Sequence, residues 1–92
     1  MKSIIQDNKE CYFCHKIEGI ALHHCFPGRN RKASDKYGFV VYLCHNHHVG
    51  NEGVHRDNQS LSIFKRLCQA KFEQTHTRKE FIKIIGKSYL EE

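Results

Sequence analysis

The chain has 92 residues, of which 39% are hydrophobic and none is tryptophan, and its formal net charge is +5 with all eight histidines neutral. A chain this short buries only about 60% of its unfolded surface, so we expect one domain that needs a metal or another cross-link. Five cysteines are an odd number, which argues against a closed set of disulfides, and no segment approaches the ~18 apolar residues of a membrane span.

The N-terminal part predicts a polar leader followed by a metal-binding turn. Residues 1–10 lack the apolar region of a secretion signal, which favours a cytoplasmic protein in a reducing compartment. Paired cysteines in such a compartment bind metal more often than each other. The Cys11-x-x-Cys14 pair in CYFCHKIEG therefore predicts a zinc knuckle that ends near Gly19.

The middle of the chain predicts two strands joined by a basic loop. Residues 20–25 and 39–43 are short, apolar and β-prone. The segment between them, FPGRNRKASDKYG, is polar and basic, and its length for a hairpin loop favours a functional role. CHNHHVG then predicts one or two helical turns that stop near Gly50, before a glycine-containing loop through His55.

Two helices are expected at the C-terminal end. From Ser60 to about Thr75 the apolar residues recur at helical spacing, and Asp57 or Asn58 is a suitable N-cap. Thr77 and Glu80 form a capping-box pattern for a second helix that Gly86 would end. These helices are expected to pack on the back of the strands through Leu61, Phe64, Leu67, Phe72, Phe81, Ile82 and Ile85.

Two matched pairs of ligands predict a structural zinc ion. Zinc in such sites takes four ligands in a tetrahedron, usually two from each of two turns. Cys11 and Cys14 supply the first pair, while Cys44 and His47 supply the second with the same spacing. His45 is an alternative to His47, and His15 an alternative member of the first turn.

The remaining histidines predict a second, hydrolytic metal. They are His23, His24, His48 and His55. Three neutral imidazoles hold a cation and leave positions open for water and a phosphate oxygen, and a fourth histidine can take a proton from the attacking water. The alternative for the adjacent pair His23 and His24 is one buried ring and one exposed ring without a metal.

Residues 11–55 resemble the HNH, or ββα-metal (His-Me finger), endonuclease family. The resemblance is carried by Cys11-x-x-Cys14, by Leu22-His23-His24 and by Leu43-Cys44-x-x-His47-His48. More narrowly, HHCFPGRNR, YGFVVYLC and GVH resemble small phage-encoded HNH proteins and phage recombination-enhancement nucleases. This resemblance implies a phage or prophage origin and a small zinc-stabilised α+β fold, a β-hairpin plus helix followed by two C-terminal helices.

The resemblance assigns roles to the four histidines. His24 would be the general base, while His23 and His48 would bind the catalytic metal. His55 would be the final ligand, displaced by an insertion. The family's central asparagine is missing, because Phe39 stands at that position, and Asn30 is the candidate to support the loop instead. An all-histidine site suits Mn²⁺, Co²⁺, Ni²⁺ or Zn²⁺ better than Mg²⁺.

The basic loop predicts contacts with nucleic acid. Its candidates are Arg29, Arg31, Lys32 and Lys36, with Arg56 and Lys65 as extensions of the same track. Phosphate contacts of this kind carry affinity and little sequence information, so double-stranded or branched DNA with weak sequence preference is the expected partner. The alternative is a solvated loop. Lys79, Lys83 and Lys87 recur every four residues and are expected to form a solvated helix face.

The sequence thus predicts one domain over residues 1–92, with the zinc knuckle and ββα-metal core at 11–58 and the C-terminal helices at 59–92. The expected function is that of a metal-dependent DNA endonuclease or nickase that relies on a protein partner for targeting. The alternatives are a non-catalytic, zinc-held module that binds nucleic acid or blocks a host factor, and a metal-storage or sensor protein.

Overall fold

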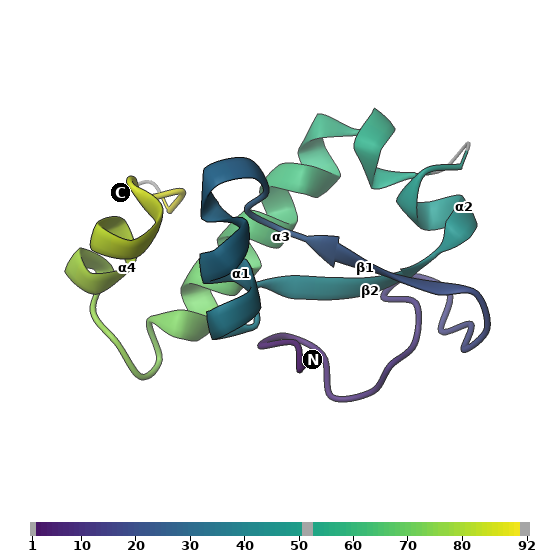
Figure 1. Ribbon diagram of the computed structural model, residues 1–92, viewed down its shortest axis with the longest axis horizontal. Helices are drawn as coiled ribbons and strands as arrows, with labels where there is room; N and C mark the ends of the chain where they lie inside the picture. The colour runs from purple at the N-terminus through teal and green to yellow at the C-terminus, as the bar shows by residue number, and fades with distance from the viewer. Residues whose placement is uncertain (1, 51–52, 91–92) are drawn as a thin grey trace.

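Two short antiparallel strands lie at the centre of the computed structural model, which describes residues 2–50 and 53–90 (Figure 1). They are β1 (Ile20–His24) and β2 (Val40–Cys44), paired with His23 opposite Val41 and His24 opposite Val40. β1 ends one residue before its predicted range does, and β2 is shifted by one residue toward the C-terminus. Within the described residues the fold is a small α+β unit: a two-stranded hairpin with helices around it.

The long loop expected between the strands is in part helical. It contains the 3-10 turn η1 (Gly28–Asn30) and the helix α1 (Arg31–Tyr37). Two features explain α1. Ser34 is buried and its hydroxyl bonds to the backbone of Phe26, while Gly38 ends the helix with a left-handed φ of 75°. A Cβ at Gly38 would lie 2.6 Å from the carbonyl oxygen of Lys2, so the chain leaves no room for a side chain there.

The predicted polar leader lies along β2. The amide of Ile4 donates to the carbonyl of Gly38, and the hydroxyl of Ser3 donates to the carbonyl of Val40. Further along, the amide of Tyr42 donates to Oε1 of Gln6 at 2.7 Å. These bonds satisfy backbone groups at the edge of β2 that β1 does not pair, which is how short sheets avoid an open edge.

The helices α2, α3 and α4 follow the hairpin in the sequence. α2 (His45–His48) starts directly after β2, and the 3-10 turn η2 (Val54–Arg56) precedes α3 (Asn58–Phe72). Asp57 caps α3 by accepting from the amide of Gln59 at 3.0 Å, so the first of the two predicted caps is the one used. α4 (Arg78–Ile85) has the predicted capping box, and Gly86 ends it in a left-handed conformation.

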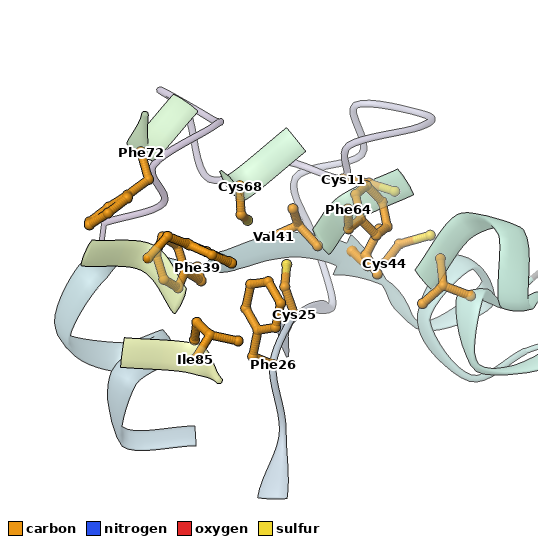
Figure 2. Close-up of a cluster of buried hydrophobic side chains, with 13 residues drawn as sticks. Cys11, Cys25, Phe26, Phe39, Val41, Cys44, Phe64, Cys68, Phe72 and Ile85 are labelled. Atoms are coloured by element: carbon orange, nitrogen blue, oxygen red, sulfur yellow. The ribbon is translucent and has the colours of Figure 1, made fainter. Parts of the chain in front are cut away.

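The hydrophobic core joins the hairpin to the two C-terminal helices (Figure 2). Phe39, Phe64, Phe72 and Phe81 are all at most 1% exposed. The prediction that Ile82 lies in the core is wrong, since its side chain is 39% exposed. In the eight-residue helix α4, Phe81 and Ile85 are one turn apart and face inward, which leaves the neighbouring Ile82 outside. Within residues 2–50 and 53–90, no helix combines the length and apolarity that crossing a bilayer requires.

Candidate metal centres and the histidine pocket

Three cysteines and one histidine meet at one end of the hairpin. The ligand atoms of Cys11, Cys14, Cys44 and His47 all lie within 4.8 Å of one another. Cys44 Sγ lies 3.2 Å from His47 Nδ1, Cys11 Sγ lies 3.5 Å from the same nitrogen, and Cys14 Sγ lies 3.8 Å from Cys44 Sγ. A tetrahedral zinc ion places neighbouring sulfur and nitrogen ligands about 3.6–3.8 Å apart. This cluster, the Cys–His cluster, could therefore hold a metal such as zinc.

Local backbone structure positions the four ligands. The amide of His15 donates to the carbonyl of Cys11, and the amide of Cys11 donates to the carbonyl of Lys16, which closes the first turn. Cys44 is the last residue of β2 and His47 is in the first turn of α2, so the strand-to-helix junction brings them together. The two alternative ligands lie elsewhere: His15 pairs with Glu10 at the surface, and His45 is exposed.

The electrostatics of the Cys–His cluster favour thiolates at two of its three cysteines. Burial alone raises the pKa of Cys11, but backbone hydrogen bonds outweigh burial and lower that pKa to about 6. A backbone hydrogen bond at His47 is the main cause of the lowered pKa of Cys44. The neighbouring thiols and desolvation raise the pKa of Cys14 despite a backbone hydrogen bond at Lys16. Neighbouring thiolates in this cluster repel one another. A divalent cation would reduce that repulsion, because cysteines bind metal as thiolates.

Three further histidines converge beside this cluster. The ligand nitrogens of His23, His48 and His55 also lie within 4.8 Å of one another, and Nε2 of His48 is 3.1 Å from Nε2 of His55. We call this group the histidine triplet. Nε2 of His23 is buried and has no hydrogen-bond partner among the described residues. A buried polar atom without a partner is costly, and a bound cation would satisfy it.

Burial also favours the neutral form of two histidines of the triplet, His23 and His48. Desolvation, followed by the nearby charges of His55 and His48, lowers the pKa of His23 to about 4. Desolvation is likewise the main cause of the lowered pKa of His48. Neutral imidazoles are the form that binds metal, so the donor set and its surroundings fit a cation.

The triplet opens into a pocket of about 350 Å³ that His24 also lines. The charged side chains on its wall, within the part of the chain that the structure describes, are Arg31 from α1 and Lys65 from α3. The pocket therefore combines several imidazoles with positive charge and suits an anion that approaches a bound metal.

The predicted basic residues are not all brought together. Arg31 reaches the pocket, while Arg29 and Lys32 are exposed on η1 and α1. Lys36 lines a different hollow, together with Asp35 and Tyr37, and its Nζ lies 5.4 Å from the centre of the Tyr37 ring. The side chain of Arg56 lies outside what the structure describes. Asn30 donates to the carbonyl of Ile85 at 3.0 Å and so ties the start of α1 to the end of α4.

One contact at the site was not expected from the sequence. Nε2 of His24 lies 2.7 Å from Oδ1 of Asp35, eleven positions further along the chain. The segment that holds Asp35 was interpreted as a loop, so no spacing rule connected the two side chains. Had the segment been recognised as a helix, Asp35 would have fallen on the same face as Arg31, one turn away.

Phe64 of α3 lies between the Cys–His cluster and the histidine triplet. Its ring centre is 5.8 Å from that of Phe13, which lies 5.2 Å from the ring of His47. On its other side the ring of Phe64 is 6.0 Å from that of His23. The buried ring of Phe64 thus neighbours His23 directly and is linked to His47 through Phe13, whose side chain is 44% exposed. Comparisons of the chain with protein-family models, with curated proteins and with solved structures find no match.

Proposed function

We propose that the protein is a metal-dependent DNA endonuclease or nickase of the HNH type, in which β1, β2 and α2 form the ββα-metal unit. One observation carries this proposal: the histidine triplet and His24 line one pocket, next to a separate Cys–His cluster. A zinc-held binding module would need only the Cys–His cluster. The additional imidazoles favour hydrolysis over binding alone, since one of their nitrogens is buried and has no hydrogen-bond partner within residues 2–50 and 53–90.

Each residue has a part in the proposed reaction. His23, His48 and His55 would hold a divalent cation, which supplies positive charge for the phosphodiester and lowers the cost of forming hydroxide. His24 takes a proton from the attacking water as the water oxygen bonds to phosphorus. The bond from phosphorus to the leaving oxygen breaks, and that oxygen takes a proton from solvent. Arg31 and Lys65 hold the phosphate through charge-assisted hydrogen bonds.

The same side chains indicate which class of substrate and which metal ions to expect. A chain with net charge +5 and cations on the pocket wall favours a polyanion. The contacts proposed here are to phosphate, so cleavage with weak sequence preference is expected. Three imidazoles without a carboxylate favour Mn²⁺, Co²⁺, Ni²⁺ or Zn²⁺ over Mg²⁺ in the triplet.

A plasmid-nicking assay tests the proposal. Supercoiled DNA is incubated with the protein and Mn²⁺, Mg²⁺, Ni²⁺ or Zn²⁺, beside the variants His24→Ala and His45→Ala. Loss of the general base should slow cleavage by about 10²- to 10⁴-fold. His45 is exposed on α2 and belongs to neither metal group, so its variant should cut at the parent rate. Equal cleavage by the parent and His24→Ala, or no cleavage with any of the four metals, contradicts the proposal.

A further inference from the structure

Asp35 and His24 form a close pair beside the histidine pocket, whose wall includes His24 but not Asp35. Oδ1 of Asp35 lies 2.7 Å from Nε2 of His24, and the side chains are 41% and 15% exposed, respectively. His24 is the last residue of β1, and Asp35 lies within α1. The pair therefore joins the strand that carries the proposed general base to the helix beside it.

Buried hydrogen bonds fix the position of α1 relative to β1. Ser34, the residue before Asp35, is fully buried, and its hydroxyl accepts from the amide of Phe26 and donates to the carbonyl of Phe26. The amide of Phe39 donates to the carbonyl of Ser34, while the amide of Cys25 donates to the carbonyl of Phe39. These bonds fix the backbone next to Asp35 and next to His24. The position of Asp35 relative to His24 is therefore set by buried contacts.

The chemistry of the contact decides which nitrogen of His24 carries the proton. An ionised carboxylate only accepts hydrogen bonds, so Nε2 of a neutral His24 must be the N–H donor. Its Nδ1 is then an unprotonated acceptor, and this nitrogen makes no hydrogen bond to the described residues. A neutral imidazole with one nitrogen tied to a carboxylate and the other free is the arrangement that a general base needs.

We propose that Asp35 is a positioning residue that holds His24 in the Nε2–H tautomer and directs its Nδ1 to the attacking water. This inference rests on the proposed nuclease function. In the hydrolysis step Nδ1 takes the proton from water, and Asp35 remains an ionised carboxylate that stabilises the imidazolium without receiving that proton.

Two simpler roles for Asp35 predict different results. If Asp35 were only a surface charge, removing it would reduce repulsion of DNA phosphates and would lower KM without reducing kcat. If it were only a structural contact, its loss would lower the melting temperature. A positioning role instead predicts a lower kcat with KM unchanged or lower and the melting temperature preserved, because the buried bonds of Ser34 remain.

The tautomer of His24 can be measured directly. We would record the ¹⁵N resonances of the imidazoles in zinc-loaded protein at a pH where His24 is neutral, and assign His24 by its absence in His24→Ala. The parent should show His24 almost entirely as the Nε2–H form. In Asp35→Asn the amide can donate to Nε2, so the population should move toward the Nδ1–H form, which has no free base. Asp7→Asn is the matched control, because Asp7 is an exposed aspartate and the carboxylate that bonds to His24 is that of Asp35.

The same variants are then compared in the nicking assay. Because loss of a residue that orients a functional side chain typically costs about 10- to 100-fold, Asp35→Asn should lower kcat by that factor. Asp35→Glu keeps the carboxylate and should recover part of the rate, whereas Asp7→Asn should match the parent. Parent-like tautomer populations in Asp35→Asn overturn the inference, whether or not the protein cleaves DNA.

The outcomes also separate this inference from the proposed function. A tautomer shift in a protein that cleaves no DNA supports the Asp35–His24 pairing and overturns the nuclease proposal alone. Cleavage that depends on His24 and is unaffected by Asp35→Asn overturns the role of Asp35 and leaves the nuclease proposal standing.

Discussion

His47 and His48 are consecutive in α2, yet their rings belong to different groups. Nδ1 of His47 lies 3.2 Å from Sγ of Cys44, and Nε2 of His48 lies 3.1 Å from Nε2 of His55. One short helix therefore carries a ligand of the Cys–His cluster and a ligand of the histidine triplet. A metal in the cluster would fix the first turn of α2 and, through it, the direction of the His48 ring.

Removal of zinc should unfold the protein. The apparent free energy of zinc binding to small domains is about 10–16 kcal/mol, as large as the total stability of about 5–15 kcal/mol of a typical domain. We expect a strong chelator to abolish the cooperative thermal transition, and zinc to restore it. Circular dichroism during melting measures both steps. An unchanged transition after complete removal of zinc would rule out a structural metal.

Cys14→Ser should have the same effect as the chelator. Cys14 is exposed, and an exposed side chain outside any special contact changes stability by less than about 0.5 kcal/mol. A large loss of stability would therefore report metal ligation and not packing. His45→Ala is the control, since His45 is the rejected alternative ligand and should melt like the parent.

His48→Ala should remove one metal and keep the other. The substitution takes away one of the three triplet nitrogens and leaves Cys11, Cys14, Cys44 and His47 in place. Native mass spectrometry of protein saturated with Zn²⁺ should count two ions in the parent and one in the variant. Two retained ions would show that the triplet does not form a metal site with His48 as a ligand.

Arg31→Ala should weaken DNA binding and its dependence on salt. Each phosphate contact contributes about 0.9 to the slope of log binding constant against log salt concentration, so the variant should lose about one unit. Lys83→Ala removes the same charge from α4, away from the pocket, and should leave the slope nearly unchanged. Equal slopes for Arg31→Ala and the parent would exclude Arg31 from the phosphate contacts.

Thr77→Ala should destabilise α4 by about 1 kcal/mol, the usual cost of losing an N-cap. The Thr77 hydroxyl accepts from the amide of Glu80 at 3.1 Å, and the amide of Thr77 donates to Oε1 of Glu80 at 2.8 Å. Glu80→Gln can keep the second bond and should cost less. Thermal melts of the zinc-loaded variants give both values, and the reverse order of stability would contradict the capping role.

Local sequence patterns were sufficient for most of the secondary structure. The capping box at Thr77 and Glu80, the stop at Gly86 and the cap at Asp57 act through neighbouring residues, so they could be predicted without knowledge of the fold. The helix α1 was missed because its stability depends on distant contacts: Ser34 is buried against Phe26, and Gly38 fits against Lys2. A polar segment whose helix depends on such distant partners has the composition of a loop, so the sequence alone predicts a loop.

Part of the candidate site could likewise be predicted from local spacing, and part depends on the fold. The spacing of Cys11 with Cys14 and of Cys44 with His47 singles out four ligands, because a turn of the chain can bring residues at that separation to one ion. The convergence of His23 with His48 and His55 needs β1 to lie beside α2 and η2, which only the folded hairpin provides. The resemblance to a known family suggested these roles for the three histidines.

Residue type and short spacing were enough to predict the hairpin, the capped helices and a cysteine–histidine set suited to a metal. The packing of separate elements placed Asp35 against His24, and it left Nε2 of His23 buried without a hydrogen-bond partner among the described residues. The physical reason is that side-chain pairing between separate elements depends on how those elements pack, and packing is decided by the whole core.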